Sequence, residues 1–337
     1  MFDFIPESVT LIAFGFILLI KGGDWFVDAA TSIAKRFHLP ELLIGATVVS
    51  IGTTLPEVMT SAIGAASGSG AVAYGNAIGS IICNTSLIAA ITIAIKPGKA
   101  DKKSLVFPVC FFFGAAVFYS LNAYIFGKFD LWMGLVLLCG FVAYMIINVL
   151  NMKKNPSTEL DEIEVESKNE DEEAKGGLIK DIGMLVLSAL VIAVGADLLV
   201  DNATLLADQL GVPQTIISLT IVALGTSLPE LVTAITSLMK GHGALSLGNI
   251  IGANIFNLVL VSGTAISINP FVVPSEATFL GNNASLIFDI PLVFAVMAIM
   301  TLPPLFKGKM YRWQGIALLG LYAAYCVLQF VVLPNFA

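Results

Sequence analysis

Ten long apolar segments constrain what this chain can fold into more than any other feature. Each is about 20 residues or longer, the length that an α-helix needs to cross the hydrocarbon of a bilayer. The pattern is not that of alternating segments of roughly ten residues, which are typical of membrane β-barrels. The sequence therefore predicts an all-α integral membrane protein with ten transmembrane helices, at roughly 8–34, 41–67, 72–95, 104–124, 130–150, 178–208, 214–239, 244–268, 284–303 and 312–332.

Composition agrees with this prediction. Of the 337 residues, 57% are hydrophobic and 12% are charged, too few charges to cover a soluble surface of this size. The acidic start, Met1 to Glu7, and the lack of an A-x-A cleavage site argue against a cleaved signal, so the first span is expected to be retained. The four cysteines fall inside predicted spans without paired spacing and are expected to be small buried side chains rather than a disulfide or zinc framework: Cys83, Cys110, Cys139 and Cys326.

Lysine and arginine lie almost entirely on one side of the predicted spans. If the chain starts outside and the spans alternate, Lys128 is on the outer side and Lys21 lies within the first span. The inner side collects the remaining basic residues: Lys35, Arg36, Lys96, Lys99, Lys102, Lys103, Lys153, Lys154, Lys168, Lys175, Lys180, Lys240, Lys307, Lys309 and Arg312. By the positive-inside rule, this predicts a multi-pass protein of the plasma membrane with both termini outside and the central loop in the cytoplasm.

The second half of the chain repeats the first. A constant shift of 173 residues, which carries Glu57 onto Glu230, aligns many identical residues without a gap. In the first half these include Gly22, Asp24, Asp28, Pro40, Gly52, Thr53, Leu55, Pro56, Gly75, Asn76, Gly79 and Asn84. The shift carries the second span onto the seventh, and a step of five spans makes the second copy cross the membrane in the opposite direction. The sequence thus predicts an inverted repeat, which places a binding site near the midplane, where each copy's helix is interrupted.

We therefore expect three parts. Residues 1–150 form the first five-helix repeat with its motif at 45–86, and residues 179–337 form the second with its motif at 218–260. Residues 151–178 form an acidic cytoplasmic linker. A regulatory cation sensor is an alternative for this linker, but a solvated, self-repelling chain is favoured because the segment has no EF-hand glycine and no periodic core.

The repeated motif concentrates oxygen atoms inside an apolar span. The first copy reads Gly-Thr-Thr-Leu-Pro-Glu at residues 52–57, and the second reads Gly-Thr-Ser-Leu-Pro-Glu at residues 225–230. In a helix, both hydroxyls share a face with the glutamate. The proline has no N–H and its ring clashes one turn earlier, so main-chain oxygens around Ser50 are expected to be freed.

This donor set suits Na⁺ and Ca²⁺, whereas zinc or copper would require His or Cys. The alternative is a proline kink with a capping acid, but a duplicated acid at membrane depth favours a cation site. The following span of each half adds Asn84 and Asn257. Their amides are possible ligands or hydrogen-bond partners that hold the glutamates.

At these residues the chain resembles the sodium/calcium exchanger family, within the cation/calcium antiporter superfamily, over nearly its whole length. The resemblance implies ten helices in two inverted halves of five, with spans 2, 3, 7 and 8 around the ions and the long spans 1 and 6 sliding to alternate access. It also implies a set of Ca²⁺ and Na⁺ ligands: the carboxylates of Glu57 and Glu230, hydroxyls or carbonyls of Thr53, Thr54, Thr226 and Ser227, the main-chain oxygens of Ser50 and Ala223, the Ser80 hydroxyl, and Asn84 and Asn257.

Four positions separate this chain from other branches of the family. Ala253 stands where many members carry a serine, so one Na⁺ site is expected to lack a hydroxyl ligand. Potassium-dependent relatives have an aspartate at the position of Asn257, which here is an amide. Proton-coupled relatives place a glutamate where this chain has Gly79 and Gly252.

The residues and the resemblance together predict a secondary active antiporter that exchanges Na⁺ for Ca²⁺ by alternating access. The alternatives are an H⁺- or K⁺-coupled Ca²⁺ antiporter and, further from the resemblance, a Ca²⁺ channel. An enzyme is not expected, because His38 and His242 both fall in predicted turns. The expected partners are Ca²⁺ and Na⁺ as substrates and the lipid bilayer, with no cofactor, no nucleic acid and a protein that functions as a monomer.

Overall fold

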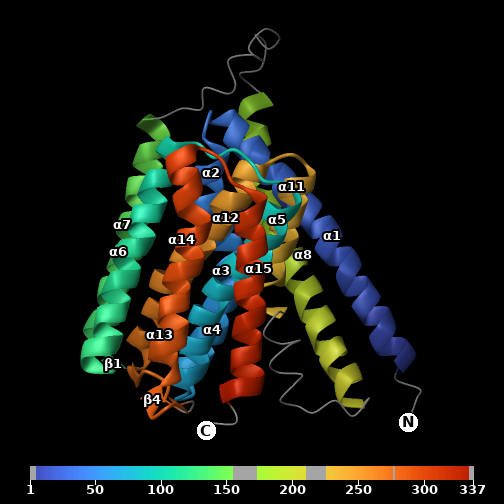
Figure 1. Cartoon of the computed structure of the whole chain (residues 1–337). Coiled ribbons are helices and arrows are strands. Elements are labelled where there is room, and N and C mark those ends of the chain that lie inside the picture. The colour runs from blue at the N-terminus through green and yellow to red at the C-terminus, as the bar shows by residue number, and fades with distance from the viewer. Residues whose placement is uncertain (1–4, 155–172, 210–224, 276–277, 334–337) are drawn as a thin grey trace.

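The computed structural model describes residues 5–154, 173–209, 225–275 and 278–333 of the chain (Figure 1). Within these ranges, nine helical segments are long and apolar enough to cross a membrane. They agree with the predicted spans to within a few residues, which confirms the all-α membrane fold. The predicted span at 214–239 is different, because the described part of it contains the shorter apolar helix Leu228–Met239 and residues 214–224 lie outside the described ranges.

The described helices follow one another in two series of similar order. The first series contains α1 (Ile5–Arg36), α2 (Glu41–Ile44), the π-helix η1 (Gly45–Val49), α3 (Ser50–Ala66), α4 (Gly70–Cys83), η2 (Asn84–Ala89), α5 (Ala90–Ile95), α6 (Lys102–Phe126) and α7 (Leu131–Lys154). The second contains α8 (Glu173–Gln209), α11 (Leu228–Met239), α12 (Gly243–Phe256), η5 (Asn257–Val261), α13 (Ser262–Ile268), η6 (Ser285–Asp289), α14 (Ile290–Lys307), α15 (Arg312–Val327) and η7 (Leu328–Val332).

The two longest helices, α1 and α8, pack against each other along one edge of the bundle (Figure 1). A Cβ atom on Gly22 would lie 2.8 Å from the Ile192 side chain, and one on Gly195 would lie 3.0 Å from the backbone of Leu19. The 173-residue shift exchanges these two pairs. The contact is therefore reciprocal, as at an interface across a two-fold axis.

Short strand pairings connect the two series. Strand β1 (Lys128–Phe129) pairs with β2 (Phe271–Val272), so that Lys128 lies opposite Val272. An isolated bridge joins Lys99 to Lys309. The 173-residue shift carries Lys99 onto Val272, and Lys128 and Lys309 both directly follow a left-handed glycine that ends a helix. The pairings thus join the same parts of the two series twice. A further hairpin of β3 (Thr278–Phe279) and β4 (Asn282–Asn283) precedes η6.

Helix α12 lies at the centre of the bundle, with α6, α7, α14 and α15 outside it (Figure 1). Helix α12 belongs to the apolar span Gly243–Ile268, in which 89% of the most apolar stretch of 18 residues is buried. Gly248 packs on the backbone of Leu42, and Gly252 packs on Ala46 and Ser50. A side chain at either glycine would collide with main-chain atoms, so these glycines are what lets α12 approach the α2–η1–α3 helix closely.

The four cysteines are free thiols, as expected from their spacing. The expectation that they are buried is wrong for Cys110 and Cys139, which are exposed on the outer faces of α6 and α7. Both lie on the flank that a bilayer would cover, where a small apolar side chain needs no protein neighbour.

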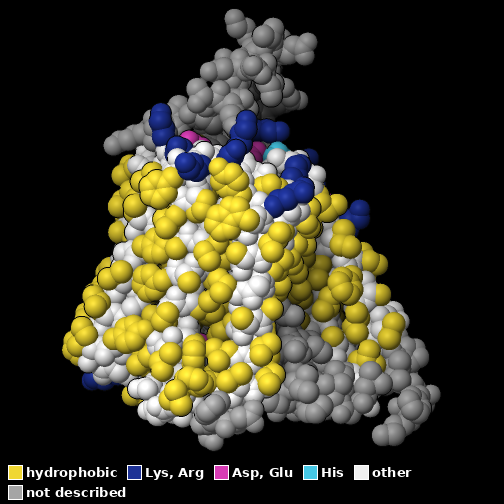
Figure 2. Space-filling view, viewed as in Figure 1, with side chains coloured by type: hydrophobic (Ala, Val, Ile, Leu, Met, Phe, Trp, Pro, Cys, Tyr) yellow, Lys and Arg dark blue, Asp and Glu magenta, His cyan; other side chains and the backbone are white. Residues whose placement is uncertain are grey.

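Charged and apolar side chains occupy different parts of the surface (Figure 2). In this view lysine and arginine gather at the end of the bundle where α7 ends and α8 begins, and hydrophobic side chains cover the flank. This distribution is the one that a membrane-spanning bundle requires, because the apolar band faces lipid and the basic residues stay in water.

Candidate cation site

Four helical segments meet around the two glutamates. Glu57 lies in α3 and Glu230 in the first turn of α11, while η2 of the first half contacts α11 and η5 of the second half contacts α3. Both glutamate residues are 0% exposed. Their carboxylates lie close enough to repel each other electrostatically. The structure therefore brings together the two acids that the sequence separates by 173 positions.

Six buried side chains in this region have polar atoms without a hydrogen-bond partner among the described residues. They form three pairs under the 173-residue shift: Glu57 with Glu230, Thr54 with Ser227, and Asn84 with Asn257. Leaving a buried polar group unpaired costs about 1–3 kcal/mol, and more for a charged group. Because the same unpaired groups recur in both halves, they are a property of the site and not a local packing defect. Their carboxylate, hydroxyl and amide oxygens are the donors that Na⁺ and Ca²⁺ take.

In the first half, the motif sits inside a continuous helix. The chain is helical from Glu41 to Ala66, with the π-helix η1 before α3 and Pro56 inside α3. The expectation that the helix is interrupted at the motif is wrong for this copy. The missing N–H of Pro56 removes one helical hydrogen bond without breaking the helix, because α3 is held by packing on both sides.

In the second half, helix α11 begins within the motif. Thr226 and Ser227 form a turn, Ser227 is the N-cap of α11, and Pro229 lies in the first turn. Proline is well suited to this position because its lacking N–H would be unpaired there in any case. Glu230 also lies in the first turn, where the helix dipole stabilises a negative charge.

Asparagines of the following spans hold the motif backbones in place. Asn76 donates from Nδ2 to the Glu57 carbonyl at 2.9 Å, and Asn249 donates from Nδ2 to the Thr233 hydroxyl at 2.9 Å. Thr233 in turn donates to the Glu230 carbonyl at 3.1 Å. These two asparagines correspond under the repeat, so both glutamates are positioned through an amide from the neighbouring span.

Asn249 also connects the two halves. The hydroxyls of Ser50 and Thr53 donate to its Oδ1 at 3.2 and 3.3 Å. The Thr53 hydroxyl lies near the Glu230 carboxylate as well. Thr53 therefore stands between the first-half helix and the second-half acid.

Both π-helices η2 and η5 begin at the predicted amides, Asn84 and Asn257. A π-turn re-aims side chains within a helix and is frequent at functional sites. The sequence gives no signal for these turns, since they depend on packing between the spans. Asn254 was also missed: its Nδ2 donates to the Thr85 hydroxyl at 2.6 Å and joins α12 to η2.

The remaining predicted ligands differ in how deeply they are buried. Ser80 is buried, and its counterpart Ala253 is fully buried with no hydroxyl to offer. Thr226 is half-buried. Ala223 lies outside the described residues. Cys83, which carried no predicted role here, lies beside Ser227 and Glu230.

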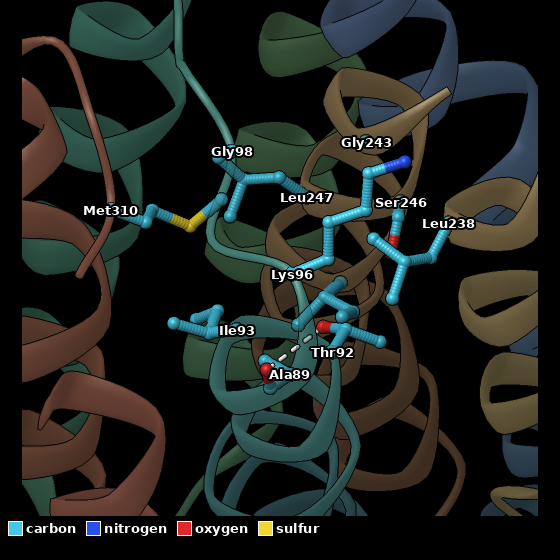
Figure 3. A pocket seen from close by; sticks show the side chains of 11 residues that line it. Ala89, Thr92, Ile93, Lys96, Gly98, Leu238, Gly243, Ser246, Leu247 and Met310 are labelled. Atoms are coloured by element: carbon cyan, nitrogen blue, oxygen red, sulfur yellow. Dashed lines mark hydrogen bonds between the residues drawn. The ribbon is translucent and has the colours of Figure 1, made fainter. Parts of the chain in front are cut away.

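A pocket at the lysine-rich end of the bundle is separate from the glutamates (Figure 3). Its wall comes from α5, from α12 and from two connecting segments, one with Gly98 and one with Met310. Lys96 is its charged lining residue. Thr92 uses its hydroxyl on the Ala89 carbonyl at 2.8 Å. A pocket with a cationic and mostly apolar lining does not suit Na⁺ or Ca²⁺.

An ionic contact joins α1 to α11 at the same end. Lys240 Nζ lies 2.7 Å from Asp28 Oδ1 and 3.5 Å from Asp24 Oδ1. Asp24 and Asp28 are one helical turn apart on α1, so one lysine reaches both. Their counterparts Asp197 and Asp201 have no Lys or Arg within 4.0 Å among the described residues, and the repeat places Ser67 where the second half has Lys240.

Comparison with known proteins gives a consistent result. A family model described as sodium/calcium exchanger protein matches residues 7–150 and 180–331. Sodium/calcium exchanger MaX1 of Methanosarcina acetivorans is 31% identical over 97% of this chain and 100% of its own length. An uncharacterized membrane protein of Methanocaldococcus jannaschii is 34% identical over 91% of this chain and 93% of its own.

Solved structures of the sodium-calcium exchanger NCX_Mj share the fold. The form soaked with 10 mM Na⁺ and zero Ca²⁺ matches with a TM-score of 0.77 at 30% identity, over 96% of this chain and 98% of that one. The form soaked with 2.5 mM Na⁺ and 10 mM Sr²⁺ matches equally well, with a TM-score of 0.77 over 97% and 99%.

Proposed function

The chain belongs to the sodium/calcium exchanger protein family, and from that premise we propose that it is a secondary active antiporter that exchanges Na⁺ for Ca²⁺ across the membrane by alternating access. The observation that carries the proposal is the set of unpartnered buried atoms on Glu57, Thr54 and Asn84 and on their second-half counterparts. Hard oxygen donors at this depth require a hard cation to offset their burial.

Charge balance explains how one site serves both ions. Glu57 and Glu230 carry two negative charges when ionised, which one Ca²⁺ neutralises and which two or three Na⁺ on overlapping oxygens also offset. Because the two ions compete for the same carboxylates, Ca²⁺ leaves when Na⁺ binds. Mutually exclusive occupancy of this kind is the physical basis of exchange.

The ligand assignment follows the pairs of the repeat. Glu57 and Glu230 bind the ions directly, with hydroxyl or carbonyl oxygens from Thr53, Thr54, Thr226 and Ser227. The main-chain oxygens of Ser50 and Ala223, the Ser80 hydroxyl and the amides of Asn84 and Asn257 complete the set. Ala253 leaves one Na⁺ position without a hydroxyl.

The two sides of the membrane are assigned from the basic residues. With the lysine-rich end in the cytoplasm, the chain termini lie outside and the segment between α7 and α8 lies inside. The reciprocal contact of α1 and α8 supports a sliding motion of this pair against the rest of the bundle. The protein acts as a monomer, since each chain contains both halves of the site.

Flux measurements test the proposal. Vesicles loaded with Na⁺ and diluted into Na⁺-free buffer should take up ⁴⁵Ca²⁺, and vesicles loaded with an impermeant cation should not. Uptake that is indifferent to internal Na⁺ would overturn Na⁺/Ca²⁺ exchange. An H⁺- or K⁺-coupled antiporter would instead respond to a proton or potassium gradient alone, and a Ca²⁺ channel would give single-channel currents without any counter-ion.

A further inference from the structure

Another buried carboxylate lies in the membrane on helices that do not hold the glutamate pair. Asp289 ends η6, within the span Ser285–Lys307, and is 8% exposed. Among the described residues, no Lys, Arg or His lies within 4.0 Å of its carboxylate. An intramembrane acid without a basic partner is costly, and its charge must be balanced by something that the chain itself does not supply.

The side chains around Asp289 orient it without neutralising it. The Tyr325 hydroxyl donates to Oδ1 at 3.2 Å, and Gln329 donates from Nε2 to the same oxygen at 3.1 Å. Both donors come from α15 and η7, which pack beside α14. Neutral donors hold a carboxylate in a fixed direction, but they leave its net charge in place.

Two further hydroxyl groups lie near Asp289. Tyr74 of α4 is 3% exposed, and its hydroxyl has no hydrogen-bond partner among the described residues. It lies close enough to Asp289 to interact electrostatically, and the Ser285 hydroxyl lies beside both. A carboxylate and a hydroxyl from η6 and a second hydroxyl from α4 thus lie close together.

This cluster has no counterpart in the first half. Helix α6 occupies the same place in the first series as α14 does in the second, and it contains no Asp or Glu. Asp289 lies at the end of α14 that begins near β4, opposite the lysine-rich end (Figure 1). The cluster therefore belongs to one side of the membrane only, unlike the glutamate pair.

A line of hydroxyls connects the cluster to the central site. Tyr74 interacts with Tyr119 of α6, and the buried Tyr119 hydroxyl lies beside Ser262. Ser262 donates to the Asn257 carbonyl at 3.0 Å. Two titratable groups interact electrostatically with Asp289, Tyr74 of α4 and Tyr325 of α15. Tyr119 of α6 lies near Tyr74, and Cys326 lies near Tyr325.

We propose that Asp289, Tyr74 and Ser285 form a site for a monovalent cation, Na⁺ or a proton, that is separate from the glutamate pair and lies toward the end of the bundle opposite the lysine-rich end. One positive charge balances one carboxylate, whereas Ca²⁺ would keep an excess charge in an apolar surrounding. Na⁺ and the proton share this chemistry, and they differ in what replaces them.

Infrared difference spectroscopy of the full chain in lipid tests this site. All samples carry Glu57→Gln, so that the central pair no longer dominates the carboxylate signal, and the matched control adds Asp289→Asn. One arm replaces N-methylglucamine by Na⁺ at fixed pH, and the other changes pH without Na⁺. We expect a carboxyl band that responds in one arm and is absent from the control.

The two arms identify the ion. A response to Na⁺ at fixed pH assigns Na⁺, a response to pH without Na⁺ assigns the proton, and no Asp289-dependent response in either arm overturns the proposal. Tyr325→Phe keeps the carboxylate and should shift the midpoint of the response at least about threefold, which corresponds to one lost hydrogen bond. An unchanged midpoint in this variant contradicts the geometry, and it serves as the test if Asp289→Asn does not fold. Failure of Na⁺/Ca²⁺ exchange would show in flux and leave this band unaffected.

Discussion

The two copies of the glutamate motif have nearly the same sequence and different backbones. Glu57 lies within a helix that continues through Pro56, whereas Glu230 lies in the first turn of α11 behind a turn at Thr226 and Ser227. The dipole of α11 stabilises the Glu230 carboxylate by roughly 0.3–1 kcal/mol, a support that Glu57 lacks. A repeated sequence thus supplies matching side chains in surroundings that differ electrostatically.

Neutralising either glutamate is the strongest test of this comparison. Glu57→Gln and Glu230→Gln should each reduce Ca²⁺ exchange by at least about 100-fold, because removing one partner of a buried charge cluster costs about 2–5 kcal/mol. The measurement is Na⁺-dependent ⁴⁵Ca²⁺ uptake into proteoliposomes. Glu41→Gln, an acid at the start of the same helix as Glu57, is the matched control and should stay within about twofold. If one variant alone loses exchange, the two acids do not share a site.

The second half has Ala253 where the first half has the Ser80 hydroxyl. Exchanging these residue types should change Na⁺ binding in opposite directions, by less than loss of a glutamate does. Ala253→Ser should strengthen Na⁺ binding, and Ser80→Ala should weaken it, by about 2- to 10-fold, the value of one hydrogen-bonding group. The Na⁺ concentration for half-maximal exchange reports both. An Ala253→Ser protein with unchanged Na⁺ dependence would show that this position does not reach the ion.

The contact of Lys240 with Asp24 and Asp28 has no equivalent at the other end of the repeat. Lys240→Met should release α1 from α11 and shift the half-saturating Na⁺ concentration on the inner face by about two- to fivefold, because exposed ion pairs contribute up to about 1 kcal/mol. Ser67→Lys should create the missing contact near Asp197 and Asp201 and shift the same quantity in the opposite direction. Inside-out vesicles provide the measurement, and shifts of equal sign would refute the ionic explanation.

The smallest effect concerns the starts of α6 and η6. Asp101 caps α6 by accepting from the backbone N–H of Ser104 at 3.0 Å and from its hydroxyl at 2.6 Å, whereas Asn283 accepts from the backbone of Ser285 at 2.9 Å. Partial burial raises the pKa of Asp101, but the hydrogen bonds from Ser104 and Lys103 outweigh it and lower the pKa. Because the folded-state pKa is lowered, this stabilisation is present above the unfolded pKa and is lost as pH falls through the folded value.

Asp101→Ala should therefore lower the free energy of unfolding by about 1 kcal/mol at neutral pH and by less in acid. Asn283→Ala should show a smaller loss without pH dependence, since an amide does not titrate in this range. Tryptophan fluorescence during heating in detergent at several pH values measures both. A pH-independent loss for Asp101→Ala would contradict the assigned role of its charge.

Much of the fold could be predicted because the membrane restricts the choices. The length of the apolar segments predicted the helical spans, because a helix satisfies all backbone hydrogen bonds within one segment in a bilayer. The constant shift between Glu57 and Glu230 revealed the repeat. The π-turns at Asn84 and Asn257 could not be predicted. They arise from packing between spans, and no local residue type encodes them.

The candidate site was predicted through residue types, and its supports were not. The repeat aligns Asn76 with Asn249, but their hydrogen bonds to the Glu57 carbonyl and to Thr233 depend on which helices become neighbours. The burial of Asp289 could not be predicted for the same reason. A single acid near the start of a predicted span could face water, and tertiary contacts with Tyr325 and Gln329 are what bury it.

By itself the sequence determined the membrane class, the inverted repeat and the pair of acids, because hydropathy and an exact register survive without knowledge of any contact. Tertiary structure decided that the first motif stays helical while α11 begins within the second, and that Asp289 in the second half of the chain is enclosed by neutral donors. Both depend on the balance between desolvation and hydrogen bonding at a given place in the bundle. That balance is a property of neighbours in space, which a linear pattern does not contain.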